Sequence, residues 1–106
     1  MLYIASDHAG FQLKKEIIKY IKTQLNKEVE DLGPTAFVET DDFPDFAIPL
    51  AKAVAKSKDS FGILICSTGQ GMCIAANKIK GAYAIMGYNI QTTELGRKHN
   101  NANVLC

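Results

Sequence analysis

The sequence has almost no excess of charge of either sign. Its 106 residues include 12 lysines and arginines and 11 aspartates and glutamates, which gives a formal net charge of +1. A protein that binds nucleic acid or a membrane surface through charge carries a basic excess. We therefore expect no nucleic-acid partner and no membrane partner. Only one of the basic residues is an arginine, Arg97.

Long hydrophobic runs are also missing. No apolar stretch approaches the roughly 20 residues that a membrane-spanning helix needs. The N-terminus lacks a charged segment followed by a long apolar one, so we expect no secretory signal. Hydrophobic residues still make up 47% of the chain, which is enough for one small core at this length. We expect a single domain over residues 1–106.

Cysteine is scarce, and its spacing does not suggest pairing. Cys66, Cys73 and Cys106 contain no CxxC pair and their number is odd. This argues against a disulfide framework and favours reduced thiols in a cytoplasmic protein. No cluster of His, Cys and Asp has metal-ligand spacing. The acidic run at 41–45 is one candidate metal site, but we favour a solvated helix N-terminus, where the helix dipole stabilises carboxylates.

Apolar segments and turn signals alternate along the chain. We predict strands at 1–6, 29–32, 61–66, 82–86 and 104–106, and helices at 10–25, 71–79 and 89–98, with another helix starting at Pro44. Strands that alternate with helices and are apolar on both faces are typical of an α/β protein. We predict a three-layer α/β/α sandwich around a parallel five-stranded sheet.

Apolar spacing assigns an inner face to two of these helices. The helix at 10–25 has an expected core face of Leu13, Ile17, Ile21 and Leu25, with Ile18 alongside. Its expected solvent face carries Lys14, Lys15, Lys19 and Lys22. The helix that starts at Pro44 has an expected core face of Phe46, Ala47, Leu50, Ala51, Val54 and Ala55.

Polar residues gather near the predicted strand ends, where parallel sheets bind their ligands. Asp7 and His8 follow the first strand, and residues 66–71 (CSTGQG) follow the third. His99 and Asn100 come just before the fifth strand. We group all of them at one edge of the sheet as candidate site residues.

The loop after Cys66 is typical of an anion-binding turn. Gly69 and Gly71 let main-chain N–H groups approach a ligand, and the following helix points its positive end at them. A dinucleotide fingerprint would need glycine where Ile74 stands, and a P-loop would need a Lys-Ser/Thr pair. A cysteine phosphatase would need an arginine where Met72 stands. A tight turn that binds nothing is the remaining alternative.

Cys66 and the two histidines are the candidate proton carriers. A cysteine beside a helix N-terminus favours the thiolate, so Cys66 is a candidate base or nucleophile. The alternative is a buried, apolar cysteine. His8 and His99 can pass protons near neutral pH, although a lone histidine is often structural. Together with an oxyanion cradle, these residues suit cofactor-free proton transfer next to a carbonyl.

Four motifs in this order resemble the ribose-5-phosphate isomerase B family, within a group that includes galactose-6-phosphate isomerase subunits. They are SDHAGFQLK, DDFPDFA, GILICSTGQGMCIAANK and RKHNNANVLC, and they span the whole chain. The resemblance implies a Rossmann-like fold and a homodimer or homotetramer with active sites built from two chains. It implies interconversion of ribose 5-phosphate and ribulose 5-phosphate in the pentose phosphate pathway, without metal or coenzyme.

The resemblance also implies roles for the residues around the glycine turn. Cys66 matches the family's base, which moves a proton between C1 and C2 of the sugar. Thr68 matches a polar helper beside that base. Ser67, Gly69 and Gly71 match the anion hole for the C1 oxygen.

Residues outside that turn match the family's substrate contacts. Asp7 and His8 match a pair that contacts the sugar and its phosphate end. His99 matches the residue that opens the furanose ring, and Asn100 matches its neighbour in substrate binding. Some relatives use a glutamate as base at the position of Met72, which cannot titrate, so the chain falls in the cysteine-using branch.

The chain departs from the family pattern in two places. Phe43 stands where many relatives have a tyrosine, so one hydroxyl contact to the substrate is lost or supplied otherwise. The family chain also continues into a helical C-terminal segment whose arginines hold the phosphate. We expect residues 1–106, with Arg97 as the single arginine, to lack that segment.

Two other functions remain open on the sequence. One is isomerisation of a six-carbon sugar phosphate, such as allose 6-phosphate or galactose 6-phosphate. The other is a flavodoxin-like module that binds a phosphorylated ligand without chemistry.

Overall fold

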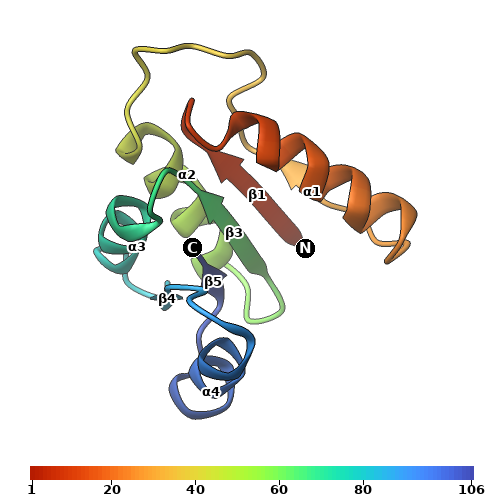
Figure 1. The fold of residues 1–106 in the computed structure, drawn as a ribbon. Helices are drawn as coiled ribbons and strands as arrows, with labels where there is room; N and C mark the ends of the chain where they lie inside the picture. The colour runs from red at the N-terminus through yellow and green to blue at the C-terminus, as the bar shows by residue number, and fades with distance from the viewer.

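The computed structural model describes all of residues 1–106 as one parallel sheet with flanking helices (Figure 1). In chain order the elements are β1 (Leu2–Ser6), α1 (Phe11–Thr23), β2 (Glu30–Asp31), α2 (Pro44–Ala55), β3 (Phe61–Ile65), α3 (Gln70–Asn77), β4 (Ala84–Ile85), α4 (Ile90–Asn100) and β5 (Val104–Leu105). All strand pairs are parallel, in the order β2-β1-β3-β5-β4. The predicted fold class is confirmed. No helix has both the length and the apolar character needed to cross a membrane.

The main core lies between the sheet and the helices α2 and α3. Ala47, Leu50, Ala51 and Val54 of α2 are fully buried, as the apolar spacing predicts. Burying a leucine or valine side chain contributes about 1.5–3 kcal/mol. Gly62 of β3 lets α2 come close, because a Cβ there would lie 2.5 Å from the Leu50 side chain.

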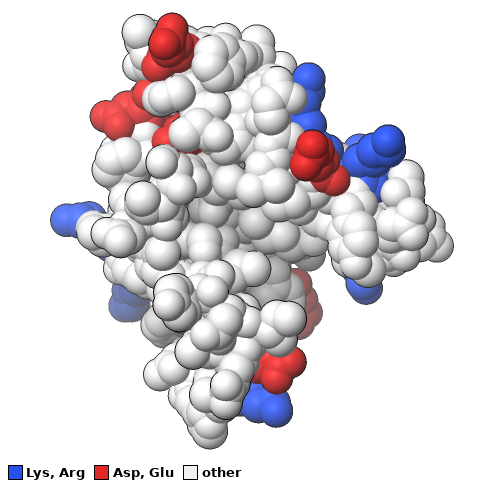
Figure 2. Space-filling model, in the orientation of Figure 1, with Lys and Arg blue, Asp and Glu red and all other residues white.

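The opposite face of the sheet is only partly covered. The start of α1 packs against Ile65 of β3, and α4 packs on β4, where Gly96 lies against Ile85. An open groove runs between the two helices and is lined in part by Ile63 and Leu105. Figure 2 shows no charged side chain over the middle of this face. The apolar residues on its α1 side, which we call the open sheet face, are Leu13, Ile17, Ile63, Ile65 and Leu105.

The expected burial of the helix at 10–25 is wrong at three positions. Leu13 is 50% exposed and Leu25, just past the helix, is 46% exposed, whereas Lys14 is only 1% exposed. The buried residues of α1 are Phe11, Lys14 and Ile21. The other three lysines of the predicted solvent face are exposed, as expected. Apolar spacing alone misses this stripe because a lysine is part of it.

Two oxygens replace water around the buried Lys14 ammonium. Nζ donates to Oδ1 of Asp31 at 2.8 Å and to the carbonyl of Pro34 at 2.6 Å. It also lies 5.4 Å from the centroid of the Phe11 ring. A buried ammonium is tolerated only when such partners compensate for lost hydration. Lys14 therefore ties α1 to the end of β2 and to the loop that follows it.

Replacing Lys14 with methionine keeps most of the buried volume but removes the charge and both hydrogen bonds. We expect the free energy of unfolding to fall by about 1–3 kcal/mol, because the Pro34 carbonyl loses its donor. Chemical denaturation measures this change. Lys19→Met, on the exposed side of α1, is the control and should change stability by less than about 0.5 kcal/mol. Equal stability of the two variants would contradict this role of Lys14.

Candidate active site

The carboxyl ends of β1 and β3 meet near the middle of the sheet. The chain passes from β1 to β2 on one side and then to β3 on the other, so the strand order reverses between β1 and β3. Sheets of this kind bind ligands in the crevice at that point. The Asp7 N–H donates to the Ile65 carbonyl at 3.2 Å. A Cβ at Gly10 would lie 2.6 Å from the same oxygen, so glycine at this position lets the two loops touch.

Cys66 is the first residue after β3. It is half-buried and lines an open pocket of about 340 Å³ beside α1. The Gly69 N–H donates to its Sγ at 3.0 Å, and Gly69 precedes α3 with a φ of 82°, which favours glycine. This hydrogen bond and the positive end of α3 both stabilise negative charge on the sulfur. The sulfur therefore lies at the start of α3 with a main-chain donor directed at it.

The main-chain donors of this turn differ in part from the expected anion hole. The Gly69 amide is engaged by the cysteine sulfur and is not free for a ligand. The amides of Ser67, Thr68 and Gly71 have no acceptor within the chain. Thr68 Oγ1 accepts the N–H of Gln70 at 3.3 Å. The amides of Ser67, Thr68 and Gly71 are therefore candidate donors to a ligand oxygen.

The other two cysteines are less suited to act as a base. The Cys73 thiol donates to the carbonyl of Ala84 at 3.4 Å. Burial raises the pKa of the Cys106 thiol, and the neighbouring Cys73 raises it further. Cys106 therefore stays protonated. Cys66 is the thiol that combines access to the pocket with a main-chain donor.

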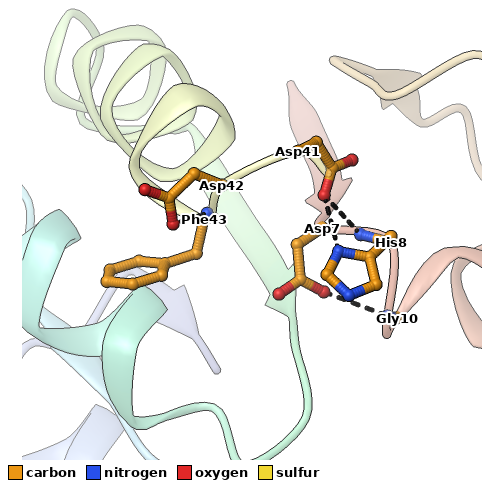
Figure 3. A network of polar contacts seen from close by, with 6 residues as sticks. All are labelled: Asp7, His8, Gly10, Asp41, Asp42 and Phe43. Carbon is orange, nitrogen blue, oxygen red and sulfur yellow. Dashed lines mark hydrogen bonds and ion pairs between the residues drawn. The ribbon is translucent and has the colours of Figure 1, made fainter. Parts of the chain in front are cut away.

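A carboxylate from the loop before α2 fixes His8. Oδ1 of Asp41 accepts the His8 main-chain N–H and also lies at hydrogen-bond distance from the ring Nδ1, both at 2.9 Å (Figure 3). This hydrogen bond raises the pKa of His8 above its ordinary value, and burial opposes the rise. The charges of Asp41, Asp7 and Glu39 raise it further. The ring is therefore protonated to a higher pH than that of a free histidine.

Asp7 follows β1, and Phe43 immediately precedes α2 (Figure 3). Asp7 is almost fully buried, and its Oδ1 accepts the Gly10 N–H at 3.1 Å. The Phe43 ring packs on the first turn of α3, since a Cβ at Gly71 would meet it at 3.1 Å. An apolar ring, with no hydroxyl for a substrate, thus borders the glycine turn.

The structure places His99 and Asn100 at the edge of the sheet opposite Cys66. The expectation that they lie beside the loop after β3 is therefore wrong for residues of the same chain. They end α4, and the chain then enters β5 at its amino end. Arg97, two residues earlier, stacks on the ring of Phe61 at the start of β3, with 4.9 Å between the guanidinium carbon and the ring centroid. Cys66 follows the opposite end of that strand. In a parallel sheet, a residue just before one strand and a residue just after the neighbouring strand lie at opposite edges.

Sequence reasoning missed Asp41. The interpretation of the 41–45 run as solvated acids is correct for Asp42 and Asp45 but wrong for Asp41, whose side chain is 8% exposed. No local pattern separates Asp41 from its neighbours, because its partner His8 lies 33 residues away in the sequence. No three His, Cys, Asp or Glu side chains are grouped as metal ligands in the structure.

Similarity to known proteins extends over the whole chain. The model of the ribose/galactose isomerase family matches residues 2–106. The probable ribose-5-phosphate isomerase B of Mycoplasma genitalium is 52% identical over 107 residues, which cover 99% of this chain and 69% of that protein. The ribose-5-phosphate isomerase B of Mycolicibacterium paratuberculosis is 38% identical, over 98% of this chain and 65% of that protein.

The same similarity is present in three dimensions. The crystal structure of the Mycoplasma genitalium ribose-5-phosphate isomerase B with bound ribulose-5-phosphate matches with a TM-score of 0.93 at 51% identity. The match covers 99% of this chain and 69% of that one, so the chain spans about two thirds of the length of these relatives. The chain belongs to the ribose/galactose isomerase family.

Proposed function

We propose that this chain acts as an aldose–ketose isomerase that interconverts ribose 5-phosphate and ribulose 5-phosphate. The observation that carries the proposal is the Cys66 sulfur, held by the Gly69 N–H at 3.0 Å beside the β1/β3 crevice. It occurs in a chain 52% identical to a probable ribose-5-phosphate isomerase B. Its three free thiols also favour a cytoplasmic location.

Proton transfer is assigned to Cys66. Its thiolate takes the proton from C2 of the open-chain aldose. The electron pair of that C–H bond forms a C1=C2 double bond, and the π pair of the C1 carbonyl moves onto its oxygen. The product of this step is an enediolate. The proton of the C2 hydroxyl then passes to O1, and the Cys66 thiol returns its proton to C1, which gives the ketose and restores the thiolate. Thr68 is the polar helper beside the sulfur.

Main-chain amides are assigned to the oxygen that becomes negative. The amides of Ser67, Thr68 and Gly71 are available at this turn, and each donor in such a hole contributes roughly 10²–10³ in rate. Gly69 supports the site through its bond to the cysteine sulfur. Asp7 and His8 are assigned to the sugar and its phosphate end, which needs a positive donor.

We also propose that two copies of the chain share each active site. His99 and Asn100, assigned to ring opening and substrate binding, lie at the edge of the sheet opposite Cys66. A second copy can bring its own His99 to the crevice. The open sheet face offers an uncharged, apolar surface for this contact. The assembly is then a homodimer, or a homotetramer built from such dimers.

The variant Cys66→Ala tests the proton-transfer role. We expect kcat for ribose 5-phosphate to fall by about 10²–10⁴-fold, the usual contribution of a general base. A coupled assay for ribulose 5-phosphate measures the rate. Cys73→Ala removes a neighbouring thiol that donates to Ala84 and should keep most of the activity. Near-normal turnover in Cys66→Ala would rule out this base.

Mixing two inactive variants tests the shared site. Cys66→Ala and His99→Ala each remove one proposed component of every site in a homodimer. In a mixed dimer, one site keeps both residues if they come from different chains. We expect co-refolding of equal amounts to restore up to about a quarter of the wild-type activity. No recovery, with mixed dimers present by mass spectrometry, would place both residues in one chain's site.

A further inference from the structure

Asp41 is a buried carboxylate whose one charged partner is His8. Its side chain is 8% exposed, Oδ1 lies at hydrogen-bond distance from both the main-chain nitrogen and the ring Nδ1 of His8, and Oδ2 is buried without a partner. A buried carboxylate is costly unless a positive charge compensates it. The only ion pair that Asp41 makes is the one with His8. The His8 imidazolium is therefore the charge that stabilises it.

The loop that carries Asp41 also fixes the plane of the His8 ring. Phe37 packs edge-on against His8, with 6.2 Å between ring centroids, and edge-on against Phe11 of α1, also at 6.2 Å. Nδ1 is occupied by Asp41, whereas Nε2 has no hydrogen-bond partner and the side chain is 36% exposed. The ring is held on one side and free to bind on the other.

We propose that Asp41 is a positioning residue, which holds His8 through Nδ1 so that an Nε2–H is presented to the phosphate end of the substrate. The proposal rests on the proposed function, which assigns His8 to that end of the sugar phosphate. A cationic N–H donor binds a phosphate oxygen more strongly than a neutral one. Asp41 acts only through His8 and touches no substrate atom.

The charges that shift the pKa of His8 are all acidic. Asp41 and Glu39 come from the loop before α2, and Asp7 comes from the turn after β1. All three raise the pKa of His8, against the opposing effect of burial. A raised pKa keeps the imidazolium present to higher pH, and the cation is lost as the pH rises through that value. Removing the Asp41 charge must move this loss to lower pH.

An NMR titration of the full chain tests the proposal, since His99 is the only other histidine. In Asp41→Asn the amide oxygen can still accept both hydrogen bonds, but the charge is gone. We expect the His8 titration midpoint to move to lower pH. Asp45→Asn removes the same charge at the start of α2, where it is not among the groups that shift His8. The His8 titration midpoint in Asp45→Asn should equal that of the wild type.

Kinetics provide the second readout. At pH values above neutral, we expect the KM of Asp41→Asn for ribose 5-phosphate to rise about 10-fold, because a hydrogen bond to a charged group is lost. The kcat should stay close to the wild-type value, because Asp41 does not touch the reacting carbons. Asp41→Glu, which keeps the charge, should have a midpoint and a KM between those of the wild type and Asp41→Asn.

Several outcomes overturn the proposal. These are an unchanged His8 midpoint in Asp41→Asn, an equal displacement in Asp45→Asn, or a displacement in Asp41→Glu as large as in Asp41→Asn. The NMR titration of His8 is also recorded with inorganic phosphate as the probe. This measurement does not require the chain to turn over a substrate. A chain without isomerase activity would therefore contradict the proposed function, whereas the His8 midpoints would still decide the role of Asp41.

Discussion

The site depends on the parallel pairing of β1 with β3. Ser6, the last residue of β1, lies opposite Ile65, the last residue of β3, so the loops that follow the two strands start at the same level. The hydrogen bond from the Asp7 N–H to the Ile65 carbonyl joins them, and Gly10 removes the one side chain that would force them apart. This pairing places Cys66 and His8, from distant parts of the sequence, just after the ends of adjacent strands.

The two loops supply different chemistry. The loop after β3 provides Cys66 and unpaired main-chain donors, which suit a carbon acid and the oxyanion it produces. The loop after β1 provides His8, in a neighbourhood that is otherwise acidic. Figure 2 shows acidic side chains gathered at the end of the molecule where the loop before α2 lies. In the proposed function, the positive charge on His8 meets the phosphate at this acidic end, and Asp41 has its proposed role because it holds His8.

Local pattern predicted much of the fold. The buried face of α2 follows from apolar spacing, and the position of Cys66 at a strand end follows from the run of apolar residues before the glycine turn. The buried Lys14 and Asp41 could not be predicted, because their partners lie 17 and 33 residues away and are brought together only by the sheet. The place of His99 was recoverable from topology, since a residue just before a parallel strand lies at its amino end.

Solvent deuterium tests most directly the central claim, that a thiol at the β1/β3 crevice carries a proton between two sugar carbons. The chain is incubated with ribose 5-phosphate in D2O, and NMR identifies the carbons that acquire the label. We expect deuterium at C2 of the recovered ribose 5-phosphate and at C1 of the ribulose 5-phosphate, because a thiol in an open pocket exchanges its proton with solvent. Binding or interconversion with no deuterium at either carbon would contradict the claim.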